Sequence, residues 1–151
     1  MNINFRKATR DDVQNIVRLL ADDPLGATRE KYIEPLPSKY YAAFDEINSD
    51  KNNYLIVAEL DKQIIGTLQL TLMTHLTYQG GKRGLIEGVR ADKSVRGQGV
   101  GKAMLEWAIQ KAKDEGCHVV QLTTDKKRPD ALEFYKKRGF VASHEGMKLY
   151  C

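Results

Sequence analysis

The sequence predicts a single α/β domain, residues 1–151, of the mixed α+β type, with helices on both faces of a mixed sheet. The length suits one domain, and 42% of the residues are hydrophobic, which is enough for one core. Short turns between the early strands are typical of antiparallel hairpins, whereas a helix-length segment between two later strands indicates a parallel strand-helix-strand crossover. We therefore expect about six to seven strands, antiparallel in the N-terminal part and parallel at the central crossover.

The N-terminal third is expected to contain one strand and two helices. Ile3 to Lys7 has strand character, and Thr9 behind it can cap a helix. The apolar residues of that helix recur at helical spacing, and they are Val13, Ile16, Val17 and Leu20. Asp23 to Ser38 holds three prolines and a glycine, which predicts a loop or broken helix before a second short helix from Lys39 to Asn48.

The middle of the chain is expected to form antiparallel strands. Tyr54 to Ala58 is a continuous apolar run of strand length. The Asp61-Lys62 turn then returns the chain through a second strand from Gln63 to Met73. Leu85 to Ala91 has the character of a further strand, so this part of the chain predicts a hairpin extended by a third strand.

The last third supplies the crossover and the C-terminal elements. A helix from Gly99 to Glu115 is followed by a buried strand from His118 to Thr123. Pro129-Asp130 can open a short helix, because proline suits the first helical position. The apolar pattern of Phe140 to Ser143 and of Met147 to Tyr150 predicts two more strands.

Composition argues against several classes of protein. The net charge of +4 is spread among acidic residues without a basic block, so nucleic acid is not an expected partner. No apolar run approaches the ~20 residues that span a bilayer, and the N-terminus lacks the features of a signal peptide, so we expect a cytoplasmic protein without a membrane partner. Cys117 and Cys151 are too few and too far apart for a disulfide framework or a metal site.

Residues 96–102, Arg-Gly-Gln-Gly-Val-Gly-Lys, stand between a predicted strand and a predicted helix. We call them the glycine turn. Helix starts carry unpaired N–H groups and the positive end of the helix dipole, and glycines let a phosphate approach the backbone closely. A dinucleotide-binding fingerprint would need glycine at Lys102, and a Walker loop would need four residues between Gly97 and Gly101 and a hydroxyl at Ala103. Neither pattern fits.

The spacing of Arg96, Gly99 and Gly101 resembles the pyrophosphate loop, Arg/Gln-x-x-Gly-x-Gly/Ala, of the GNAT acetyltransferases. Residues 131–140, Ala-Leu-Glu-Phe-Tyr-Lys-Lys-Arg-Gly-Phe, resemble the second signature of that family. The resemblance covers nearly the whole chain, and the most similar versions are small bacterial enzymes. Many members carry a cofactor-contacting asparagine after the fifth strand; the nearest candidates here are Asp125 and Arg128, and the choice between them stays open.

The resemblance implies a GNAT-like fold and an N-acetyltransferase that uses acetyl-CoA as cosubstrate and no metal. In the family, the pantetheine arm pairs with the strand before the phosphate loop, and the loop amides hold the diphosphate. The cofactor-binding residues implied here are Val89, Arg90, Ala91, Arg96, Gly97, Gln98, Gly99, Val100, Gly101, Lys102, Phe134, Tyr135 and Lys137.

Two residues are the catalytic candidates. Tyr135 matches the family tyrosine that protonates the departing thiolate, and a tyrosine hydroxyl with its ordinary pKa of about 10 keeps its proton at neutral pH. Glu87 lies mid-strand among apolar residues, where a carboxylate is costly without a partner or a purpose, so it is the candidate base. Its alternatives are an ion pair with a nearby Arg or Lys, or a place on a solvent-facing pleat.

The acceptor is expected to be the amine of a small molecule, such as an amino acid, a polyamine or an aminophosphonate, attacked directly in a ternary complex. The segments Asp23 to Tyr41 and Thr74 to Gly81 are expected to shape its pocket. Two alternatives remain open, a protein N-acetyltransferase and a non-catalytic CoA-binding sensor module. A homodimer also remains open beside the monomer.

Overall fold

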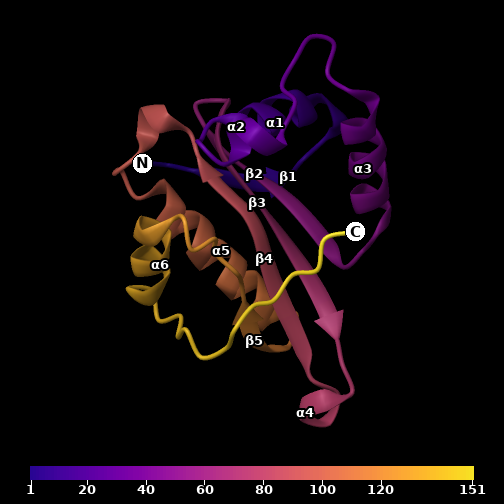
Figure 1. Ribbon diagram of the computed structural model, residues 1–151, viewed down its shortest axis with the longest axis vertical. Coiled ribbons are helices and arrows are strands. Elements are labelled where there is room, and N and C mark those ends of the chain that lie inside the picture. The colour runs from indigo at the N-terminus through magenta and orange to yellow at the C-terminus, as the bar shows by residue number, and fades with distance from the viewer. The chain divides into compact units, whose positions relative to one another are not determined.

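The computed structural model describes residues 1–151 as two compact units, Met1–Gln121 and Leu122–Cys151. The first unit holds a five-stranded sheet in the order β1-β2-β3-β4-β5 (Figure 1). Its strands are β1 (Asn4–Lys7), β2 (Asn53–Leu60), β3 (Gln63–Thr74), β4 (Lys82–Ala91) and β5 (Cys117–Gln121). All neighbours are antiparallel except β4 and β5, which are parallel, so the predicted mixed sheet, antiparallel in its N-terminal part and with a parallel strand-helix-strand crossover, is confirmed.

Six α-helices and two short 3-10 helices complete the chain. They are η1 (Arg10–Asp12), α1 (Val13–Ala21), α2 (Gly26–Arg29), α3 (Ser38–Ser49), α4 (Thr77–Gly80), η2 (Lys93–Val95), α5 (Val100–Asp114) and, in the second unit, α6 (Pro129–Lys136). In the first unit, α1 and α3 cover one face of the sheet and α5 the other (Figure 1). The segment expected to be a loop or broken helix contains the single turn α2. No helix is both long and apolar enough to cross a membrane.

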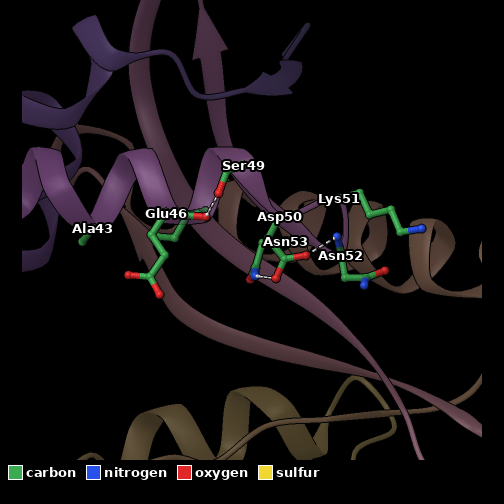
Figure 2. A pocket seen from close by; sticks show the side chains of 8 residues that line it. Ala43, Glu46, Ser49, Asp50, Lys51, Asn52 and Asn53 are labelled. Carbon is green, nitrogen blue, oxygen red and sulfur yellow. Dashed lines mark hydrogen bonds between the residues drawn. The ribbon is translucent and has the colours of Figure 1, made fainter.

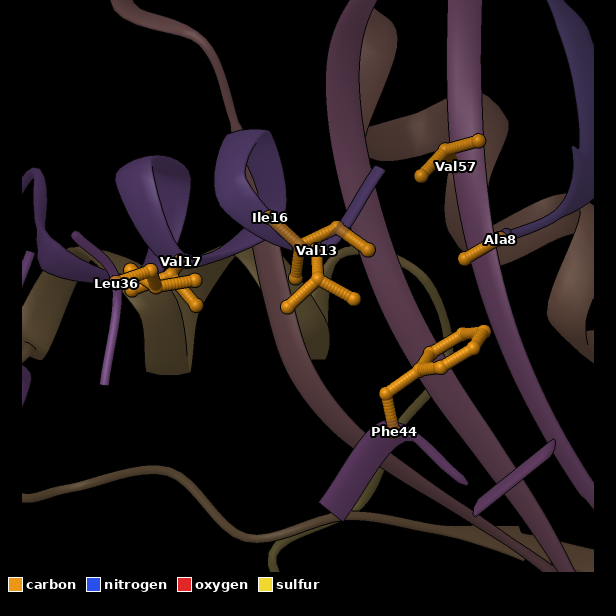
Figure 3. Close-up of a cluster of buried hydrophobic side chains, with 7 residues drawn as sticks. All are labelled: Ala8, Val13, Ile16, Val17, Leu36, Phe44 and Val57. Carbon is orange, nitrogen blue, oxygen red and sulfur yellow. The ribbon is translucent and has the colours of Figure 1, made fainter. Parts of the chain in front are cut away.

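The core between the sheet and the helices α1 and α3 is a cluster of seven buried side chains (Figure 3). They are Ala8, Val13, Ile16, Val17, Leu36, Phe44 and Val57. Three of the four apolar positions predicted for α1 are fully buried, and the fourth, Leu20, packs partly against the cluster. A helix of nine residues is marginal by itself, so α1 depends on this packing, since burying one such aliphatic side chain contributes about 1.5–3 kcal/mol.

Two glycines let α5 approach the opposite face of the sheet closely. A Cβ at Gly84 of β4 would lie 3.2 Å from the Cβ of Ala112 in α5. A Cβ at Gly66 of β3 would lie 2.7 Å from the sulfur of Met104, which precedes Ala112 on α5. Ala108, Ala112, Met104 and Leu105 are buried here. The close packing fixes α5 and, with it, the position of the helix start that follows the glycine turn.

The second unit contradicts the last part of the prediction. No strand forms at Phe140 to Ser143 or at Met147 to Tyr150, and residues 141–151 are exposed throughout. Met147 and Leu149 are each 93% exposed. Apolar alternation supplies strand propensity, but a strand exists only when a neighbour pairs with its N–H and C=O groups, and these residues have no ladder partner. The sheet therefore has five strands and not six or seven. A single domain over residues 1–151 stays a prediction.

Candidate active site

A β-bulge interrupts β4 next to the predicted cofactor-binding residues. Gln69 of β3 faces Glu87, but Thr67 faces Arg90, so one residue of β3 opposes two of β4. Gly88 lies in the bulge with a φ of +63°, in a region that favours glycine. The bulge changes the direction of the strand just before Val89. The sequence did not indicate this bulge.

The other side of β4 is open over the same residues. β5 pairs with residues 82–85 of β4, and its last partner is Leu85. From Ile86 to the end of β4, no strand adds to this edge, so β4 and β5 part after Leu85. The predicted pantetheine-binding residues Val89, Arg90 and Ala91 lie in this half. A strand with one unpaired edge has backbone groups that a ligand amide can satisfy, as the proposed pairing requires.

The glycine turn presents unbonded amides to solvent. Gly97 and Gly99 have φ angles of +77° and +85°, and α5 begins at the next residue, Val100, without a side-chain cap. No hydrogen-bond acceptor meets the N–H groups of Gly97, Gly99 or the first three residues of α5, while the N–H of Gln98 donates to Val95 at 3.2 Å. A Cβ added at Gly97 or Gly99 would meet nothing within 4 Å, so the space over these amides is open.

The charges around the glycine turn favour an anion. The fifteen-residue α5 directs the positive end of its dipole at the turn. Arg96 and Lys102 are exposed beside it, and Lys102 Nζ lies 3.8 Å from Glu106 Oε1 in an exposed ion pair. Unpaired amides, a helix start and two exposed cations fit the diphosphate of coenzyme A, which would bind through the residues predicted for it.

Asp92 and Arg18 form an ion pair where the chain leaves β4 and approaches the glycine turn. The sequence did not indicate a role for either residue. Asp92 follows β4 and accepts the N–H of Ser94 at 2.9 Å, which caps η2. Its other oxygen accepts Nη1 of Arg18, from α1, at 2.8 Å. The Ser94 amide and then the Arg18 guanidinium lower the pKa of Asp92 to about 2. The Asp-x-Ser spacing was the available sign of this cap.

We expect Asp92→Asn to destabilise the protein at neutral pH but not in acid. Because the folded pKa of Asp92 lies below its ordinary value, its ionised form stabilises the fold above about pH 4, and that stability is lost as the pH falls toward 2. Urea unfolding should show a difference of about 1 kcal/mol at pH 7 that disappears near pH 2. The exposed Asp11→Asn serves as control, and a difference that persists at pH 2 would contradict the assignment.

In the second unit, the spacing of the Phe-Tyr and Gly-Phe pairs is explained by a Schellman motif at the end of α6. The N–H of Phe140 donates to the carbonyl of Tyr135 at 3.2 Å, and the N–H of Gly139 donates to that of Lys136 at 3.1 Å. Gly139 has the required positive φ, +92°. The rings of Phe134 and Phe140 contact the Tyr135 ring edge to face, at centroid distances of 5.4 and 5.9 Å. Tyr135 is thereby held by its own helix end.

The other residues predicted in α6 lie around this motif. Lys137 is exposed at the end of the helix. The half-buried Phe134 carries the guanidinium of Arg138 over its ring, with the Arg138 Cζ 3.7 Å from the centroid. The sequence-predicted set therefore divides between the two units, with Glu87, residues 89–91 and the glycine turn in the first and Phe134, Tyr135 and Lys137 in the second. Asp125 and Arg128 also belong to the second unit.

Glu87 is exposed, so the argument that its carboxylate is buried among apolar residues is wrong. The buried Ile86 does not enclose it, because successive strand side chains point to opposite faces. Of the alternatives considered, the solvent-facing pleat is the one observed. An exposed carboxylate can accept a proton from an acceptor amine that contacts it. The role of Glu87 as the base therefore stays a proposal.

An ion pair joins β4 to the segment expected to shape the acceptor pocket. Arg90 Nε lies 3.8 Å from Asp23 Oδ2, and both side chains are 16% exposed. Asp23 also accepts the N–H of Gly26 at the start of α2. Further along, the Tyr40 hydroxyl of α3 donates to Glu30 at 3.0 Å and accepts the N–H of Lys31. The segment after α1 is thus tied to β4 at one end and to α3 at the other.

A hollow of the surface lies elsewhere and contains none of the predicted residues (Figure 2). It has a volume of about 590 Å³ at the C-terminal end of α3 and the turn into β2. Its lining is Ala43, Glu46, Ile47, Ser49, Asp50, Lys51, Asn52 and Asn53. No group of His, Cys, Asp or Glu side chains in the chain is arranged to hold a metal ion.

The chain is an α+β protein with a strand-helix-strand crossover and unpaired amides at the start of the crossover helix. Residues 17–140 match the model of the acetyltransferase (GNAT) family, which covers most of the chain, so the protein belongs to that family. A crystal structure described as a transcriptional regulator from Bacillus halodurans C-125 is 53% identical, covers 99% of this chain and 100% of that one, and superposes with a TM-score of 0.96.

The curated relatives include enzymes with named activities. The aminoalkylphosphonate N-acetyltransferase of Salmonella typhimurium is 30% identical over 63% of this chain and 61% of its own length. The glucosamine 6-phosphate N-acetyltransferase of Trypanosoma brucei brucei is 36% identical over 58% of this chain and 57% of its own length. The chain thus spans about three-fifths of the length of the curated relatives it matches.

Proposed function

We propose that the protein is an acetyl-CoA-dependent N-acetyltransferase that acetylates the amine of a small molecule by direct attack in a ternary complex. The observation that carries the proposal is the glycine turn, whose unpaired amides stand at the start of α5. The open edge of β4 beyond Leu85 supports it independently. Family membership supports the choice of acetyl-CoA over another phosphate-bearing ligand.

The first unit binds and orients the cosubstrate. The amides of the glycine turn hold the diphosphate, and Arg96 and Lys102 neutralise it. Residues 89–91 of β4 pair with the amide groups of the pantetheine arm. Acetyl-CoA supplies a thioester carbonyl carbon for attack. Orientation of two substrates in one complex is a large source of rate enhancement, because it removes the entropic cost of bringing them together.

The proton transfers are assigned to two side chains. The attacking amine forms a C–N bond and loses one proton, which Glu87 accepts directly or through a water molecule. The C–S bond breaks, and the Tyr135 hydroxyl gives its proton to the departing sulfur. Tyr135 is then restored by a proton from solvent. No metal takes part in this proposal.

A small amine acceptor is supported by the two curated relatives, which are named for an aminoalkylphosphonate and for glucosamine 6-phosphate. The test is a thiol-release assay with acetyl-CoA and a panel comprising 2-aminoethylphosphonate, glucosamine 6-phosphate, spermidine, the amino acids and short peptides with free amines. Calorimetry with coenzyme A accompanies it. Binding together with transfer supports the proposal, and binding without transfer to any amine supports the sensor module. Transfer only to peptide amines supports the protein N-acetyltransferase.

Because the Bacillus halodurans relative is described as a transcriptional regulator, the assay must also distinguish an enzyme from a regulator. A regulator that binds coenzyme A without turnover would give a calorimetric titration but no thiol release with any acceptor. Absence of heat with coenzyme A, in a protein whose far-ultraviolet circular dichroism shows the mixed fold, would overturn the enzyme and the sensor alike.

We expect Glu87→Gln to lower kcat/KM for the amine about 100-fold, because an amide cannot accept the proton of the attacking amine. Acetyl-CoA affinity should stay within about twofold. Glu46→Gln, an exposed change on α3 outside the site, is the matched control. An unchanged kcat/KM would remove Glu87 from the mechanism.

A further inference from the structure

A polar patch interrupts the α1/α3 face of the sheet beside Glu87. Gln69 lies directly across the β3–β4 ladder from Glu87, so their side chains share one face of the sheet. That face is the one packed on α1, because Thr67, two residues before Gln69, is the register partner of the core residue Val57. Gln69 is half-buried and Glu87 exposed, so the patch is open where the core ends.

Hydrogen bonds fix the orientation of the Gln69 amide. Asn53 of β2 donates its Nδ2 to Asp50 Oδ2 at 2.8 Å, and a carboxylate oxygen can only accept. The Asn53 carbonyl oxygen therefore faces β3. There it accepts Nε2 of Gln69 at 2.9 Å and the Thr71 hydroxyl at 2.7 Å. With its nitrogen committed to Asn53, Gln69 turns its Oε1 away from that residue.

The result is two acceptors on adjacent strands without a donor between them. Gln69 Oε1 has no hydrogen-bond donor, and neither has the Glu87 carboxylate. Side chains directly opposite on an antiparallel pair have Cβ atoms about 5 Å apart, so one N–H-rich group can bond to both. A primary ammonium, with three donors and a positive charge, is complementary to a carboxylate and a carbonyl oxygen held side by side.

We propose that Gln69 binds the acceptor's amino group together with Glu87, and that Asn53 and Asp50 hold it in that orientation. The inference rests on the proposed function, since it supplies the subsite in which the attacking amine waits. A primary ammonium can donate one N–H to each of the two oxygens and keeps a third N–H free, so Gln69 contributes to recognition of the acceptor's amino group. Glu87 accepts one proton from the bound ammonium and passes it to solvent, which frees the nitrogen lone pair, and accepts the second proton as the C–N bond forms. Gln69 keeps the nitrogen in place.

The test uses Gln69→Leu and Gln69→Met, which keep the bulk of the side chain but remove the carbonyl oxygen. The probe is the panel amine that the wild type acetylates fastest. Each variant should raise the KM for that amine about tenfold, as the loss of one charge-assisted hydrogen bond predicts, with kcat within about threefold and the KM for acetyl-CoA unchanged. Thr71→Val removes the other donor to Asn53 and should leave the amine KM unchanged.

The outcomes separate this inference from the proposed function. If the wild type releases thiol and both Gln69 variants, folded by circular dichroism, keep the wild-type amine KM, the Gln69 role is overturned and the transferase stands. If Thr71→Val raises the amine KM as much as Gln69→Leu, the effect is a general loss of packing and the inference also fails. If the wild type binds coenzyme A but acetylates no amine, the proposed function fails and the amine subsite with it.

Discussion

Gly99→Ala is expected to weaken coenzyme A binding about 10- to 100-fold in isothermal titration. The added Cβ meets no protein atom, so it fills the space through which a phosphate reaches the amides of the glycine turn. One lost charge-assisted hydrogen bond is worth about 1.5–3 kcal/mol, which corresponds to that range of affinity. The positive φ of +85° adds a folding cost of about 1 kcal/mol, because a side chain strains the left-handed backbone.

The matched control is Gly116→Ala, at the other end of α5. Gly116 has a φ of +82°, and a Cβ there also meets nothing within 4 Å, so both variants carry the same strain without a clash. Each should lower the melting temperature by roughly 2 to 4 °C, whereas Gly99→Ala alone should lose coenzyme A affinity. Equal affinities in the two variants would show that the glycine turn does not bind the diphosphate.

Tyr135→Phe is expected to lower kcat about 100-fold while the affinity for acetyl-CoA changes less than about twofold. The variant lacks only the hydroxyl that protonates the departing sulfur, a general-acid contribution of that size. The variant retains the edge-to-face contacts of the ring with Phe134 and Phe140 and the backbone hydrogen bond that ends α6. Stopped-flow thiol release and equilibrium titration measure the two quantities.

A second tyrosine of the same unit controls this experiment. Tyr150 is 89% exposed and carries no proposed role, so Tyr150→Phe should leave kcat unchanged. A raised solvent isotope effect in Tyr135→Phe would accompany the slower step, since proton delivery to sulfur then depends on water. If kcat is unchanged in Tyr135→Phe, Tyr135 is not the acid, whatever its effect on stability.

The order of the elements in the first unit followed from the sequence because each depends on neighbours along the chain. The apolar spacing of α1, the Asp61-Lys62 turn between β2 and β3, and the glycines that precede α5 are local features, and each expected element is present. The prediction of two C-terminal strands was wrong for the opposite reason. Residues 140–143 and 147–150 have the composition of strands, but a strand needs partners that composition does not name.

The candidate site divides in the same way. The glycine turn was predictable because glycine spacing and a helix start lie within seven residues of sequence. The exposure of Glu87, the Arg18–Asp92 ion pair and the Gln69 amide depend on contacts between residues far apart in sequence, such as the 74 positions that separate Arg18 from Asp92. Long-range pairs of polar side chains leave no periodic pattern, so the sequence alone did not indicate them.

By itself the sequence determined the family, the mixed sheet and the glycine turn at the start of a helix, because these arise from periodicity and from backbone properties of glycine that act over a few residues. Only the tertiary structure decided where β4 bulges and parts from β5, and which side chains stand at its open face. Register between strands is set by packing of the whole sheet against α1 and α5, a balance that no local segment contains.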